Sequence, residues 1–73
     1  MTVYDTTKQH LDRHPETWFT AGMIERELAQ DGISLSKSAI LLALKRLTEE
    51  GYTQQVATGL ERYDHPKWKF RKI

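Results

Sequence analysis

The residues best suited to chemistry in this chain are basic side chains that alternate with aromatic ones close to residue 73. Lys67, Lys69 and Arg71 alternate with Trp68 and Phe70. Successive side chains of an extended segment point to opposite faces, so the cations would lie on one face and the aromatics on the other. The cations can track a phosphate backbone or enter a minor groove. We expect the two aromatics to pack on the core, because each can bury a large apolar area.

The distribution of charge along the chain supports this interpretation. The net charge is only +1, but residues 1–36 carry three basic and six acidic side chains, whereas residues 37–73 carry eight basic and four acidic ones. The asymmetry is typical of a protein whose C-terminal half meets a polyanion. A solvated basic tail on a neutral protein is the alternative.

The histidines offer a second kind of chemistry, metal binding. His10 and His14 lie four residues apart and would share a helix face, but no third ligand is spaced near them. Surface histidines are therefore expected rather than a metal site. His65 precedes Pro66 and is expected in a loop. The sequence predicts neither a metal nor another cofactor.

No arrangement of residues indicates an enzyme. Ser34, Ser36 and Ser38 alternate across a turn and a helix start, where capping explains them. Glu49 and Glu50 are expected to be a solvated pair at a helix end. The chain has no glycine-rich phosphate loop, and 73 residues leave little room for a pocket that excludes water. The absence of cysteine excludes disulfides and zinc–thiolate sites.

The sequence indicates neither a membrane span nor a secretion signal. The longest apolar run, residues 39–44, is too short to cross a bilayer. The first residues lack the basic region and apolar stretch of a signal peptide. We therefore expect a cytoplasmic protein, in a cell or in an infected host.

Hydrophobic spacing predicts helices in the first half of the chain. The first covers residues 2–14 and is stopped by Pro15. The second begins after Thr20, whose hydroxyl can cap free backbone N–H groups, and is closed by Gly32. The expected core positions of both helices, spaced three or four apart, are Tyr4, Thr7, Leu11, Ile24 and Leu28.

The second half predicts a third helix and then a hairpin. The helix is capped by Ser36 or Ser38, has its core stripe at Ile40, Ala43, Leu44 and Leu47, and ends at Gly51. The period then changes to two, so residues 52–56 and 61–63 are expected as strands around a turn at Thr58-Gly59. Residues 66–73 would form a basic aromatic tail. Three helices followed by a hairpin is the order of a winged helix-turn-helix, an α+β fold, here as one domain over residues 1–73.

A set of residues from Phe19 onward carries a more specific likeness. It comprises Phe19-Thr20-Ala21, Ile24, Leu28, Gly32, Leu35, Ile40, Leu44, Leu47 and Glu49-Glu50-Gly51-Tyr52, followed by Gly59-Leu60-Glu61-Arg62-Tyr63. The stretch from Phe19 to Gly51 resembles, without a gap, the DNA-binding half of ferric uptake regulator proteins, and the last segment resembles their wing. The resemblance implies a winged helix that binds DNA.

Two features depart from that family. Its second domain, which dimerises and binds metal, has no counterpart in this sequence, so metal sensing is not expected. Its recognition helix usually shows Thr, an apolar residue, Tyr and Arg, where this chain has Ala39-Ile40-Leu41-Leu42. The side chains that would touch phosphates and base edges are therefore apolar here.

The predicted function is a DNA-binding transcriptional regulator that uses helix 37–50 and a wing over residues 53–65. A homodimer is expected, because one recognition helix covers only a half-site. Leu42 or the region of Trp18 would supply the dimer contact. The alternative is a winged helix that docks on another protein through Leu41 and Leu42. The residues expected to contact double-stranded DNA are Ser36, Lys37, Ser38, Leu41, Leu42, Lys45, Arg46, Arg62, Lys67, Lys69 and Arg71.

Overall fold

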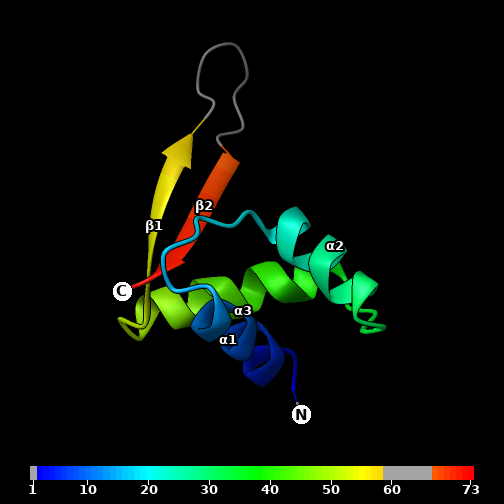
Figure 1. Cartoon of the computed structure of the whole chain (residues 1–73). Coiled ribbons are helices and arrows are strands. Elements are labelled where there is room, and N and C mark those ends of the chain that lie inside the picture. The colour runs from blue at the N-terminus through cyan, green and yellow to red at the C-terminus, as the bar shows by residue number, and fades with distance from the viewer. Residues whose placement is uncertain (1, 59–66) are drawn as a thin grey trace.

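Three helices followed by two paired strands make up the fold (Figure 1). The computed structural model describes residues 2–58 and 67–73. The elements are α1 (Val3–Arg13), α2 (Ala21–Gln30), α3 (Lys37–Glu49), β1 (Thr53–Thr58) and β2 (Lys67–Lys72). This is the predicted α+β arrangement of a helix-turn-helix with a C-terminal wing. None of the helices in the described ranges has the length and apolar character needed to span a membrane.

Each helix begins at a hydroxyl that satisfies a free backbone N–H group. Thr20 Oγ1 and Ser36 Oγ each accept a hydrogen bond, at 3.1 Å, from an amide of the following turn. At α1, Thr2 and Asp5 exchange side-chain and backbone hydrogen bonds in a capping box. The predicted caps at Thr20 and Ser36 are confirmed.

The two predicted helix-ending glycines both adopt the left-handed conformation. Gly32 and Gly51 each have a φ of +79°, which glycine reaches without steric cost. Beyond Gly32, the amide of Ile33 donates to the carbonyl of Leu28 at 2.9 Å, which closes the last turn of α2. The same bonding pattern follows Gly51, so both chain reversals are set by local chemistry.

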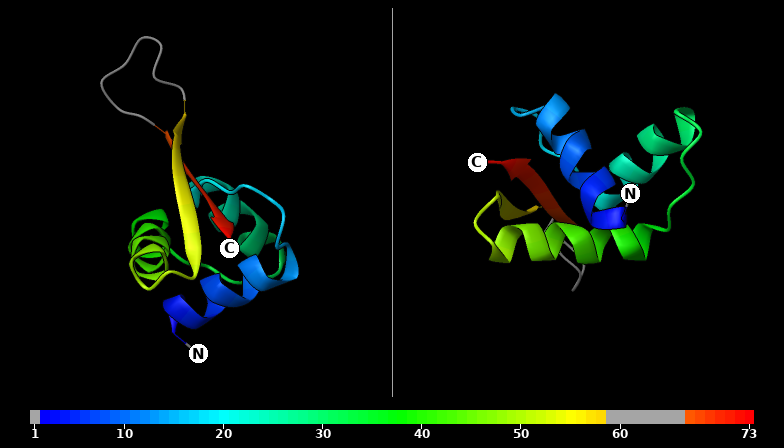
Figure 2. Two further views of the ribbon diagram at one scale, coloured as in Figure 1. Left: turned by 90° about the vertical axis from the view of Figure 1, so that its left-hand side faces the viewer. Right: turned by 90° about the horizontal axis from the view of Figure 1, so that it is seen from below.

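The core lies where α1 and α2 meet one side of α3 (Figure 2). The predicted apolar stripes of all three helices point into it. Tyr4 packs at its margin as a half-buried residue. The buried apolar core residues are Leu11, Phe19, Ala21, Ile24, Leu28, Ile40, Ala43, Leu44, Leu47 and Phe70.

The segment between α1 and α2 joins the sheet through a single residue. Phe19 and Phe70 exchange two backbone hydrogen bonds of 2.8 Å, so Phe19 lies antiparallel beside β2. Both side chains are essentially fully buried. The bridge at Phe19 thus anchors the hairpin to the start of α2.

The second strand is not where the sequence predicts it. β1 pairs with Lys67–Lys72, from Thr53↔Lys72 to Thr58↔Lys67, so the segment expected as a tail is the partner strand. The predicted strand at residues 61–63 lies outside the described residues. The local turn signal at Thr58-Gly59 suggested a short hairpin. The observed register instead places Phe70 in the core and against Phe19, and that burial outweighs a turn preference.

Only one of the two C-terminal aromatics packs on the core, contrary to the expectation for both. Phe70 is fully buried, whereas Trp68 is 40 % exposed. Trp68 pairs with Ala57, farther along the hairpin than the Phe70 pair. There it lines an open hollow beside α3, which leaves part of its side chain exposed to solvent.

A polar cluster fastens the lower end of the sheet to α1. The carboxylate of Asp12 accepts a hydrogen bond from the Tyr52 hydroxyl, and Lys72 Nζ lies 3.3 Å from Asp12 Oδ1. Lys8 Nζ lies 4.7 Å from the centre of the Tyr52 ring. These bonds, above all the one from Tyr52, lower the pKa of Asp12. They also make Lys72 part of the fold rather than a free cation for a partner.

This cluster predicts acid-sensitive stability. A carboxyl group whose pKa is lower in the folded chain stabilises it above the unfolded pKa, and that contribution is lost as pH falls through the folded pKa. Urea unfolding should therefore show stability falling between about pH 5 and pH 1. Because the Asp12 side chain is 40 % exposed, its share is at most about 1 kcal/mol. Asp12→Asn should make the free energy of unfolding depend less on pH in this range. Asp31 is an exposed aspartate at the end of α2, and Asp31→Asn should leave this pH dependence unchanged. An equal reduction of the pH dependence by both substitutions would contradict the role given to Asp12.

A second prediction concerns a buried hydroxyl in α1. Thr7 is fully buried and its Oγ1 has no hydrogen-bond partner among the described residues. Thr7→Val keeps the shape and removes the unpaired polar atom, so it should stabilise the fold by about 1 kcal/mol. Thr48→Val is the matched control, because Thr48 Oγ1 bonds both the Leu44 carbonyl and Thr53 Oγ1 at 2.8 Å. Thr48→Val should destabilise the fold by a similar amount. The urea midpoints of the two variants should therefore shift in opposite directions from that of the wild type.

Candidate nucleic-acid interface

The side of α3 that does not face the core presents an exposed surface with several polar residues. The hydroxyl of Ser36 caps the helix, and Lys37, Ser38 and Lys45 are all exposed. Leu42 lies opposite the core stripe and is 68 % exposed. Neither α1 nor α2 covers this side of α3 (Figure 2). A helix with an open face and its N-terminal residues free has the form needed to enter a major groove.

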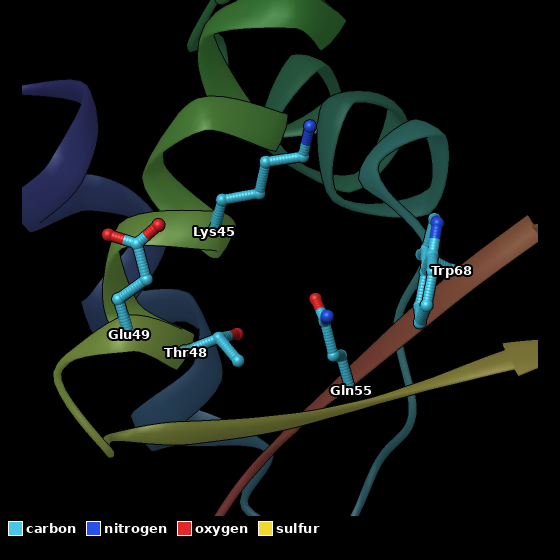
Figure 3. A pocket seen from close by; sticks show the side chains of 5 residues that line it. All are labelled: Lys45, Thr48, Glu49, Gln55 and Trp68. Atoms are coloured by element: carbon cyan, nitrogen blue, oxygen red, sulfur yellow. The ribbon is translucent and has the colours of Figure 1, made fainter.

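Lys45 borders a hollow between α3 and the hairpin. The hollow has a volume of about 310 Å³ and is lined by Lys45, Thr48, Glu49, Gln55 and Trp68 (Figure 3). Its two walls are held together by the bond between Thr48 on α3 and Thr53 on β1. Lys45 and Glu49 contribute opposite charges to this lining, so the hollow itself has little net charge.

The sequence alone did not predict that Gln55 and Trp68 line the same hollow as Lys45. In the observed register Gln55 pairs with Phe70 and Ala57 with Trp68, so all four face the helices. The period-two pattern was sufficient to put Trp68 on the same face as Phe70. The strand pairing itself was needed to bring that face over α3.

A second hollow joins the start of α3 to α2 and also holds basic groups. Arg26, Gly22 and Lys37 line it together with Glu25. Lys37 lies close to α2, since a Cβ added at Gly22 would come within 3.8 Å of Lys37 Cε. Arg26 is therefore a further candidate for phosphate contact. It was absent from the predicted set because only the packing of α2 on α3 brings it beside Lys37.

Two predicted residues of α3 are engaged elsewhere. The Arg46 guanidinium lies 4.7 Å from the centre of the Tyr4 ring, and Arg46 Nε lies 3.5 Å from Glu50 Oε2. Tyr4 also donates a hydrogen bond to Glu50, so Arg46 sits on the side of α3 that meets α1. Leu41 is partly buried and packs against the core. The open face of α3 thus has Leu42 as an exposed apolar residue and lacks Arg46.

Two basic residues of β2, Lys69 and Arg71, face away from α3. Lys69 and Arg71 alternate with the inward-facing Phe70, as the sequence predicts. The Arg71 guanidinium lies 4.8 Å from the centre of the Trp18 ring, which orients it by a cation–π contact. Lys67 opens the strand, and Arg62 lies outside the described residues. The basic groups are therefore divided between the open face of α3 and the outer face of the hairpin.

Comparison with known proteins supplies no family for this chain. No family model and no curated protein matches it. Its function must be argued from the two basic surfaces just described.

Proposed function

We propose that this chain binds double-stranded DNA as a transcriptional regulator, with α3 entering the major groove. The observation that carries the proposal is the open face of α3, where Lys37, Ser38 and Lys45 are exposed. The likeness of residues 19–51 to the DNA-binding half of ferric uptake regulators supports the same assignment. A cytoplasmic homodimer, with one α3 in each half-site, is the form we propose.

The proposal gives each exposed residue a defined contact. Lys37 and Lys45 bind phosphates or the acceptor edge of guanine, and Ser38 donates to a phosphate. Leu42 contacts a thymine methyl group, which carries little sequence information. The outer face of the hairpin, with Lys69 and Arg71, adds electrostatic attraction that is independent of sequence. Arg46 has no role in this proposal, because it is held by Tyr4 and Glu50.

A salt series with random-sequence DNA tests the proposal. Fluorescence anisotropy of a labelled duplex should report binding that weakens steeply between about 50 and 200 mM salt, because bound cations release counterions from the phosphates. Absence of binding at the lowest salt concentration would reject the proposal. Binding that does not vary with salt would argue against phosphate contacts.

Exposed Leu42 favours a second candidate function, docking on a protein. An apolar side chain with 68 % of its surface exposed stands at the middle of the open face, where the likeness to ferric uptake regulators would call for a polar residue. In this alternative the face binds a second copy of the chain or another protein and does not bind DNA.

A substitution at Leu42 separates the two candidates. Under the docking alternative, Leu42→Asp should abolish self-association in sedimentation experiments, because it places a charge in an apolar contact. Stability should change by less than about 0.5 kcal/mol at so exposed a site. Val56→Asp on the hairpin, where Val56 is 42 % exposed, is the matched control and should leave association unchanged. A wild-type chain that stays monomeric at every concentration and binds DNA would rule out docking between copies.

A further inference from the structure

The structure brings two histidines and a glutamate together at the junction of α1 and α2. His10 lies in the last turn of α1, His14 is the C-cap residue that follows the helix, and Glu27 approaches from α2. One ligand atom from each lies within 4.8 Å of the other two. His10 Nε2 is 3.0 Å from Glu27 Oε1, and the two imidazole centres are 5.2 Å apart. The expectation of surface histidines is correct for His14, which is exposed, and wrong for His10, which is buried. Folding also supplies Glu27 as a third group, which the spacing along the chain did not predict.

The cluster is both partly buried and accessible. His10 is only 5 % exposed, His14 is exposed, and the Glu27 side chain is 38 % exposed. The ring of Phe19 lies 5.1 Å from the His10 ring and 5.9 Å from the His14 ring, which restricts how both imidazoles can turn. An ion can therefore reach the cluster from solvent and meet ligands that are already close to one another.

The ligand types select the class of ion. Imidazole nitrogen with one carboxylate oxygen suits zinc and related divalent transition metals, whereas calcium and magnesium prefer sets of oxygen ligands. Three protein ligands leave a fourth position for water. We propose that His10, His14 and Glu27 form a binding site for Zn²⁺. This site is separate from the open face of α3, and it does not depend on DNA binding.

The site would link the end of α1 to α2. An ion that binds only the folded chain stabilises it by mass action. The competing explanation is that His10 and Glu27 form only a hydrogen-bonded pair. That explanation gives His14 no role, since no hydrogen bond or ion pair of its side chain occurs among the described residues. His14 is therefore the residue whose substitution distinguishes the two.

Calorimetric titration of the metal-free full chain with ZnCl₂ tests the proposal. We expect one Zn²⁺ per chain and a thermal midpoint that rises with zinc. His14→Ala and Glu27→Gln should each weaken binding by about tenfold or more, since even residues that only orient metal ligands account for that much. Because His14 is exposed, its variant should keep the fold, which circular dichroism can verify. His65→Ala is the matched control and should bind as the wild type does.

Three results would overturn the site. They are no binding of Zn²⁺ at neutral pH, unchanged affinity in folded His14→Ala, or an equal loss in His65→Ala. None of these measurements involves DNA, so failure here and failure of DNA binding are distinguishable.

Discussion

Phe70→Ala should destabilise the chain by about 3–5 kcal/mol, the cost of deleting a buried aromatic ring. Phe70 is fully buried, and its backbone joins Phe19 to the sheet. A domain of this size has a total stability on the order of 4–11 kcal/mol, so the loss is a large fraction of the total. Urea unfolding followed by circular dichroism measures the loss.

Trp68→Ala is the matched control for that result. Trp68 lies on the same strand and the same face as Phe70, but it is 40 % exposed. It should cost less than Phe70→Ala, because Trp68 keeps part of its apolar area in water and leaves no enclosed cavity when it is removed. Equal losses at the two positions would contradict the observed register of β2, and so would a larger loss at Trp68.

Lys37→Glu with Lys45→Glu should weaken binding to random duplex DNA by about a hundredfold. Each lysine lost from a phosphate or base contact costs on the order of 1–3 kcal/mol and lowers the salt slope by about one. The reversed charges add repulsion from the phosphates. Both lysines are exposed, so the fold should be retained. Anisotropy over the same salt series measures the affinity and the slope together.

The control for this pair must change the net charge equally on another surface. Lys8→Glu with Arg13→Glu does so on α1, away from the open face of α3. Because Lys8 also contacts Tyr52, circular dichroism must first show that this variant is folded. This variant should keep most of the affinity, apart from a long-range electrostatic loss that salt screens. If both double variants lose affinity equally, DNA responds to net charge alone and α3 is not the binding element. If neither loses affinity, the docking alternative gains support.

The division of basic groups between two surfaces bears on how DNA would be bound. Lys37 and Lys45 stand on α3, whereas Lys69 and Arg71 stand on the outer face of the hairpin. A single duplex lying along α3 would meet the first pair directly. The second pair would attract the phosphates of that duplex only at long range. Alternatively, it would contact the phosphates of a second duplex. Separate charge reversals on the two surfaces can be compared within the same salt series.

Sequence reasoning was reliable where the signal and its structural effect lie within one helical turn. The hydroxyls at Thr20 and Ser36 cap helices whose first amides lie three residues away. Gly32 and Gly51 adopt the left-handed backbone conformation that was predicted from their positions at helix ends. The apolar stripes of α1, α2 and α3 point into one core, because 3.6 residues per turn fixes which positions share a face. The open face of α3 followed from the same periodicity.

The tertiary structure decided everything that depends on segments distant in the chain. The partner of β1, the burial of Phe70 but not Trp68, and the contact of Arg46 with Tyr4 all required the packing of whole elements. So did the approach of Glu27 to His10 and His14. Local turn and spacing signals are each worth about a kilocalorie per mole, whereas burial of one aromatic ring is worth several. Where the two compete, as they do in the hairpin, burial sets the register and the sequence pattern alone cannot reveal it.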